Sequence, residues 1–94
     1  MTFSFFILLW MSPSHRQAEV QKIDTEIQEL QDMKLGYEAR ALRHENMAEY
    51  MQFEQKFVLE TRRHIQLAEE NRYKADLIQK QIDQLQEKRD RLTK

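Results

Sequence analysis

The feature that most constrains this chain is the near absence of turn-forming residues after position 13. Residues 14–94 contain no proline, no cysteine and a single glycine, Gly36. Roughly eighty residues rich in Glu, Gln, Lys, Arg, Leu and Ala, with so few turn formers, favour one very long helix. Such a helix would be about 120 Å long and could not fold back over its own apolar stripe. The sequence therefore predicts an all-α chain, in which a long single helix forms a coiled coil or an extended helical bundle with partner chains.

The composition favours association over catalysis. Of the residues, 33% are charged, yet the net charge is only -1, whereas a nucleic-acid-binding protein usually carries a basic face. A single rod offers no concave site that excludes water, and no phosphate-binding or nucleophile motif is present, so we expect neither an enzyme nor a cofactor. His15, His44 and His64 are too scattered along the sequence for a local metal site, and we expect them to be exposed.

Residues 1–12 differ from the helical rod predicted for residues 13–94. The apolar run at residues 3–11 is too short for a membrane-spanning helix, which needs about 20 residues. Three interpretations stay open: a tail docked on a partner or a start-site extension, a cleaved signal peptide, and a membrane-surface anchor. Pro13 behind Ser12 predicts that the helix starts within two residues of Pro13. The absence of cysteine fits an intracellular protein of the cytoplasm or cytoskeleton.

Two hydrophobic seams with heptad spacing predict pairing with other helices. The first seam comprises Val20, Ile23, Ile27 and Leu30, and the second comprises Ile78, Ile82, Leu85, Arg89 and Leu92. Arg89 occupies a core position of the second seam. A charge there can determine the register of the paired helices or the choice of partner. Alternatively, Arg89 belongs to a C-terminal end of the helix that frays. The two seams are offset by one residue, so a single heptad repeat cannot run through the whole chain.

Two places could absorb this offset. Gly36 costs about 1 kcal/mol relative to alanine inside a helix, so it is the expected weak point, where the helix would kink or end. A hairpin would need more than one turn residue, and we therefore expect a continuous or kinked helix. The second place is residues 47–59.

Residues 47–59 carry a broad apolar patch. Its members Met47, Tyr50, Met51, Phe53, Phe57 and Val58 project over roughly 160° of a helix. A two-stranded coiled coil covers a narrower stripe, so this patch needs two neighbours or one broad groove. It is either an ordinary bundle core or a docking site with Phe53 and Phe57 as anchors. The predicted partner-binding residues are these six and the apolar seam residues, and the predicted partners are other helical chains, identical or different.

The segment from about Leu42 to Thr93 resembles coiled-coil proteins of cilia and flagella, including axonemal modifiers of the inner dynein arms. The residues that carry the resemblance are Phe53, Phe57, Arg62, Arg63, Ala68 and Ala75, followed by residues 88–93. The aromatic residues are four apart where the family has three, and Thr61 stands where it has asparagine. The resemblance implies a scaffold or ruler along an axonemal complex, without catalytic activity.

We therefore expect a structural, non-catalytic coiled-coil subunit of a larger assembly, such as an axonemal scaffold or docking protein. A small helical subunit of a kinetochore, tethering or spliceosomal complex would have the same composition. A third interpretation, from another class, is a membrane-surface adaptor that uses the apolar N-terminal segment.

Overall fold

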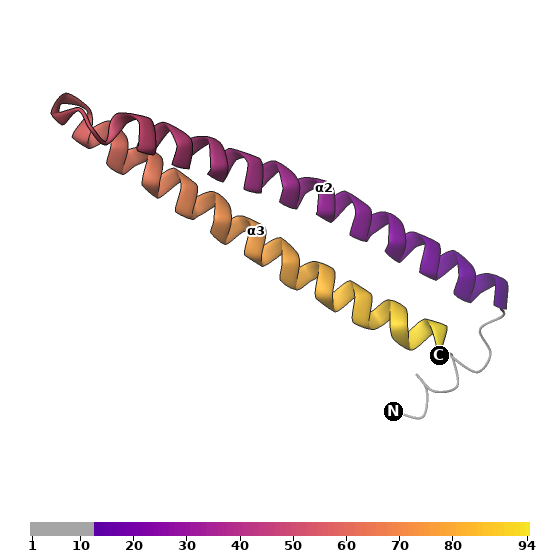
Figure 1. The fold of residues 1–94 in the computed structure, drawn as a ribbon. Helices are drawn as coiled ribbons and strands as arrows, with labels where there is room; N and C mark the ends of the chain where they lie inside the picture. The colour runs from indigo at the N-terminus through magenta and orange to yellow at the C-terminus, as the bar shows by residue number, and fades with distance from the viewer. Residues whose placement is uncertain (1–12) are drawn as a thin grey trace.

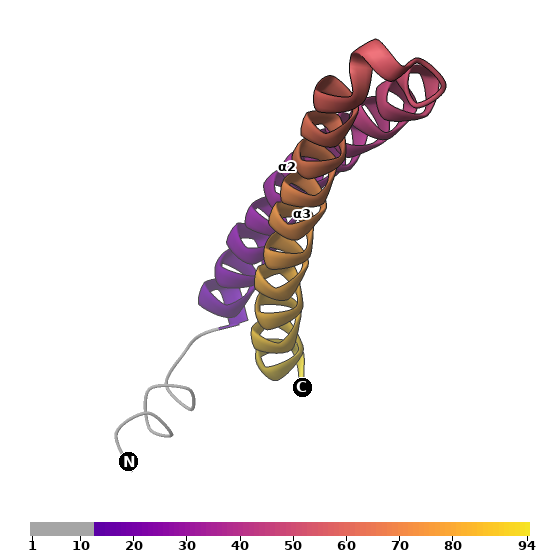
Figure 2. The ribbon, with the colours of Figure 1, turned by 90° about the vertical axis from the view of Figure 1, so that its left-hand side faces the viewer.

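The computed structural model describes residues 13–94, which form a helical hairpin. Helix α2 spans Pro13–Met51, the short 3-10 helix η1 spans Gln55–Phe57, and helix α3 spans Val58–Thr93. The two long helices run antiparallel, and the end of α3 lies near the start of α2 (Figure 1). They also lie side by side when the hairpin is turned by 90° (Figure 2). With extents of 67 × 24 × 14 Å, the hairpin confirms the predicted all-α, extended architecture.

The chain differs from the expected single rod because it reverses direction at residues 52–54. The N–H of Glu54 donates to the carbonyl of Met51 at 3.1 Å, and the N–H of Phe57 donates to the carbonyl of Glu54 at 3.0 Å. Glu54 itself is extended, with φ -115 and ψ 119. No residue of the described chain has a positive φ, so this turn needs no glycine. Two antiparallel helices can be joined by about two to five residues, and the expectation that the helix could not fold back is wrong.

Gly36 lies inside α2, which continues through it without a break. The interruption between the two heptad patterns falls instead in residues 47–59, the second of the two predicted places. A glycine costs a helix only about 1 kcal/mol. Packing of the helix against α3 offsets that cost, because tertiary contacts supply most of the stability of a helix in a protein.

The half of the hairpin that lies away from the turn has a core of large apolar side chains. Ile23 and Ile27 of α2 form a buried cluster with Ile78 and Ile82 of α3. The side chains that pack against this cluster are Leu30, Tyr37, Leu85 and Leu92. The two seams seen in the sequence therefore pack against each other within one chain.

The half near the turn has an interface of small residues. Ala41 and Ala48 of α2 and Ala68 and Ala75 of α3 are each no more than 6% exposed. Within each helix the two alanines are seven residues apart, and they extend the seams that contain Ile27 and Ile82. Each helix thus keeps one heptad pattern from end to end. Small side chains at the contact let two helices approach more closely than leucine or isoleucine would.

Polar contacts join the two antiparallel helices from the open end of the hairpin toward the turn. Asp24 pairs with Arg89, 65 residues away, and Lys34 pairs with Gln79, 45 residues away. The separation falls to 27 residues for Glu45 and Arg72. Arg89, the charged residue of the second seam, donates to the Asp24 carboxylate at 2.6 Å, so its charge is matched inside the hairpin.

Candidate partner-binding surface

The structure places most of the predicted seam residues inside the hairpin. Ile23, Ile27, Ile78 and Ile82 are between 2% and 8% exposed. Val20, Leu30, Leu85 and Leu92 are half-buried. These eight side chains contribute to pairing, but the helix that covers them belongs to the same chain.

The patch at residues 47–59 lies at the turn end of the hairpin, and the structure divides it into two groups. Met51 and Phe57 are half-buried beneath the turn. Phe53 and Tyr50 are 84% and 82% exposed, and Leu59 is 75% exposed. Met47 and Val58 are also exposed. We call the exposed group, Met47, Tyr50, Phe53, Val58 and Leu59, the apical patch.

The backbone of the turn holds Phe53 in a defined position. Phe53 stands between Met51, which ends α2, and Glu54, whose N–H bonds back to the Met51 carbonyl. Tyr50 and Phe53 line a shallow hollow together with Asn46 and Glu49. Neighbouring exposed aromatic side chains, such as Tyr50 and Phe53, mark interaction sites more often than single exposed residues do.

Around the turn, charged groups border the aromatic side chains. The Lys56 ammonium lies 5.1 Å from the centroid of the Phe57 ring and 3.6 Å from the Glu54 carboxylate. A cation over the face of an aromatic ring is attracted to it, weakly where the site is exposed. Lys56 and Glu54 therefore form a polar edge beside the exposed Phe53, as the rim does in many protein interfaces.

His44 and His64 meet in the interface, although the sequence suggested exposed histidines far from one another. Their Nδ1 atoms are 2.8 Å apart, and both side chains are part-buried. The ring centroids are 5.1 Å apart and the rings are tilted by 32°. Extending each heptad pattern along its own helix places both residues on core positions, but only the antiparallel register shows that the two meet.

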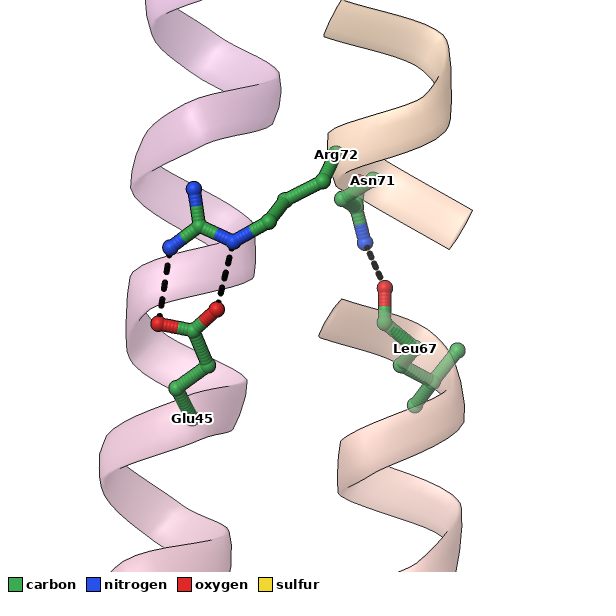
Figure 3. Close-up of polar contacts among 4 residues, drawn as sticks. All are labelled: Glu45, Leu67, Asn71 and Arg72. Atoms are coloured by element: carbon green, nitrogen blue, oxygen red, sulfur yellow. Dashed lines mark hydrogen bonds and ion pairs between the residues drawn. The ribbon is translucent and has the colours of Figure 1, made fainter. Parts of the chain in front are cut away.

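Glu45 and Arg72 form the most complete ion pair between the helices. The Arg72 Nε donates to one carboxylate oxygen at 2.5 Å, and a terminal nitrogen donates to the other at 2.8 Å (Figure 3). The hydrogen bond from Arg72 lowers the pKa of Glu45 against the opposing effect of desolvation, and the Coulombic attraction of Arg72 adds to the lowering. The same hydrogen bond is the main cause of the raised pKa of Arg72.

Asn71 is the one buried polar residue of the described chain, at 9% exposure. Its side-chain amide donates to the carbonyl of Leu67, one turn earlier in α3, at 2.7 Å (Figure 3). The amide group therefore has a hydrogen-bond partner within its own helix and needs none from another chain.

Two kinds of feature are absent from residues 13–94, a metal-binding cluster of three or more side chains and a membrane-spanning helix. This part of the chain has no group of three or more His, Cys, Asp or Glu side chains placed to hold a metal ion. None of its helices is both long enough and apolar enough to cross a membrane. The three interpretations of the N-terminal segment concern residues 1–12, outside the described part.

Comparisons with protein-family models, with curated proteins and with solved structures found no significant match to this chain.

Proposed function

We propose that this chain is a structural, non-catalytic subunit of a larger assembly and that it binds a partner protein through the apical patch. The observation that carries the proposal is the exposure of Phe53 and Tyr50, both above 80%, at the end of a stiff hairpin. Aromatic side chains are enriched among the residues that dominate binding energy at interfaces. The long paired helices hold the patch about 50 Å from the opposite end of the hairpin, so the molecule can act as a spacer.

The two seams of this chain cover each other, so two other kinds of surface can bind partner proteins. One is the apical patch, and the other is the flanks of the helices, which are mostly charged and carry exposed apolar side chains such as Leu35 and Tyr73. A charged, solvated flank contributes little affinity, because exposed ion pairs stabilise weakly. The apical patch is therefore the surface that we expect to supply most of the binding energy.

The experiment is an affinity purification with two matched double variants. Tyr50→Ala with Phe53→Ala removes the two most exposed aromatic side chains of the apical patch, while Leu35→Ala with Leu42→Ala removes exposed apolar side chains of α2 away from the turn. We expect the first variant to recover at least about tenfold less partner and the second to behave as wild type. Equal recovery by both variants would refute binding through the apical patch.

The resemblance of residues 42–93 to axonemal coiled-coil proteins suggests where to look for the partner. We propose that extracts of ciliated cells yield a partner that depends on Tyr50 and Phe53. Recovery of the same partner from cells without cilia would favour another assembly, such as a kinetochore, tethering or spliceosomal complex.

A further inference from the structure

His44 of α2 and His64 of α3 bring two metal-ligand groups together across the helix interface. Their Nδ1 atoms are 2.8 Å apart and both side chains are part-buried, so solvent reaches the pair. Imidazole nitrogen is a ligand that copper, nickel and zinc ions share. Two nitrogens bound to one ion at about 2.0 Å are about 2.8 Å apart in a tetragonal complex and about 3.3 Å apart in a tetrahedral one. The pair therefore has the spacing of two ligands of one ion.

Binding of one ion by both nitrogens requires the two rings to turn. The ring centroids are 5.1 Å apart, which exceeds the separation of the Nδ1 atoms by about two ring radii, so these atoms point toward each other. Ligands of one ion point instead at a common position beside the line that joins them. The torsion that turns a histidine ring has broad minima. A rotation of each ring therefore converts the hydrogen-bonded pair into a chelating pair.

Small side chains next to the pair leave room for this rotation. Ala41 and Ala48 lie three and four residues from His44, and Ala68 lies four residues from His64. Residues three or four apart share one side of a helix. The three alanines are between 0% and 6% exposed, so they line the interface beside the histidines. None of them carries a side chain long enough to occupy the space beside the rings.

Within residues 13–94 no third His, Cys, Asp or Glu is placed to complete the site. Glu45 follows His44 in the sequence, but both of its carboxylate oxygens accept hydrogen bonds from Arg72. Water therefore fills the remaining coordination positions, as it fills the open position of catalytic zinc sites. A site of two imidazoles favours Cu²⁺, the ion with the highest affinity for nitrogen ligands among the divalent metals of the first transition row.

We propose that His44 and His64 form a binding site for a divalent transition-metal ion, which Cu²⁺ occupies most tightly. Both rings bind the ion through Nδ1, so each carries its hydrogen on Nε2 in the bound state. The ring that donates in the hydrogen-bonded pair moves its proton from Nδ1 to Nε2 by exchange with water. The ring that accepts keeps its tautomer.

A bound ion joins the two long helices near the turn. The two histidines are 20 residues apart in the sequence, and the loop between them contains the turn. The folded hairpin holds both rings at the ion, whereas the unfolded chain does not keep them together. Metal binding is therefore linked to folding and stabilises the hairpin. The stability of the hairpin thus depends on the supply of the ion.

The first experiment measures binding of Cu²⁺ and of Zn²⁺ to the full chain by titration calorimetry in neutral buffer. His44→Ala and His64→Ala each remove one ligand, and His15→Ala is the matched control, because His15 is the only other histidine. Loss of a group that merely supports a metal ligand costs about 10–100-fold in affinity. We therefore expect each ligand variant to raise the dissociation constant for Cu²⁺ at least about tenfold, and His15→Ala to match wild type.

Three results of this titration would overturn the proposal. They are no binding of Cu²⁺ by wild type, an affinity unchanged in His44→Ala, and an affinity lost in His15→Ala. Tighter binding of Zn²⁺ than of Cu²⁺ by wild type would also contradict a site of two imidazoles. Helix content, measured for each variant without metal, checks that it folds.

The second experiment uses wild type alone, so it tests the proposal even if a variant fails to fold. Cu²⁺ is paramagnetic and broadens the NMR signals of nearby nuclei. We expect an equal amount of Cu²⁺ to broaden the amide signals around His44 and around His64 together. Signals around His15, about 45 Å away along α2, should stay sharp. Broadening around only one histidine of the pair, or around His15 instead, would show that the ion does not join the helices.

The third experiment measures the linkage between the ion and folding. With Cu²⁺ at about a hundredfold excess over its dissociation constant, the melting temperature of wild type should rise by at least about 10 °C. The rise should be absent from His44→Ala and present in His15→Ala. An ion that binds without raising the melting temperature of wild type would refute the bridge between the helices. The metal site is separate from the apical patch, and neither result decides the other.

Discussion

The Nδ1 atoms of His44 and His64 lie 2.8 Å apart across the helix interface. A hydrogen bond between two imidazole nitrogens requires one of them to carry a hydrogen and the other to accept it. The contact at 2.8 Å therefore joins one donating and one accepting Nδ1 atom.

We therefore predict that loss of this hydrogen bond lowers the free energy of unfolding by about 0.5–1.5 kcal/mol. Denaturant unfolding of wild type and of His44→Ala measures the effect, with Arg43→Ala, at an exposed neighbouring position, as the control. Equal stability of wild type and His44→Ala would contradict this prediction.

A second prediction concerns the ion pair of Glu45 and Arg72. The folded pKa of Glu45 is below its ordinary value of 4.5, so the pair stabilises the hairpin above that pH and loses its contribution as the pH falls through the folded pKa. We expect Glu45→Gln to be less stable than wild type at neutral pH and the difference to shrink under acid conditions. Glu69→Gln, at an exposed position of α3, is the control. A difference that did not depend on pH would show that the pair contributes nothing through its charge.

Gly36→Ala should stabilise the single hairpin by about 1 kcal/mol. The position is helical, and nothing lies within 4 Å of the added Cβ, so the gain in helix propensity meets no steric cost. Urea unfolding of dilute protein gives the free energy directly. Destabilisation would mean that α2 is not a regular helix at this position.

Thr61→Val should also stabilise the protein, by about 1 kcal/mol. The Thr61 hydroxyl is buried without a hydrogen-bond partner, and valine keeps the shape of the side chain without the polar group. Comparison of the unfolding midpoints of the two proteins tests this point. A loss of stability would indicate that the hydroxyl has a partner when the protein is in solution.

Ile82→Ala should be among the most costly single changes, at about 2–5 kcal/mol. Ile82 is 2% exposed and belongs to the cluster that joins the two helices. The matched change Leu35→Ala, at a position that is 62% exposed, should cost less than about 0.5 kcal/mol. Similar costs for both would be inconsistent with a hairpin core at Ile82.

The helical class, the two seams and their offset could be predicted from the sequence because large aliphatic residues mark them clearly. The turn could not, since residues 52–54 reverse the chain with ordinary φ values and without glycine or proline. The part of the helix interface that consists of alanines could not be predicted either, for a related reason. Ala41 and Ala68 are buried because the helices come close together, and a search for large apolar side chains does not detect such a contact.

The candidate site was predictable in part. The apolar character of residues 47–59 was evident, but the division into exposed and half-buried side chains depends on the turn. Phe57 was expected to be an anchor and is half-buried, while Phe53 is exposed. The meeting of His44 with His64 required the antiparallel register, which two seams alone do not specify.

The central claim is that the chain folds back on itself, and a distance between two spin labels tests it most directly. Cysteines introduced at Gln21 and Glu87, both exposed, can be labelled specifically because the chain has no other cysteine. Dilution with unlabelled protein ensures that both labels of a measured pair belong to one chain. The hairpin predicts a single distance within about 30 Å, whereas one continuous helix would separate these positions by about 100 Å and would contradict it.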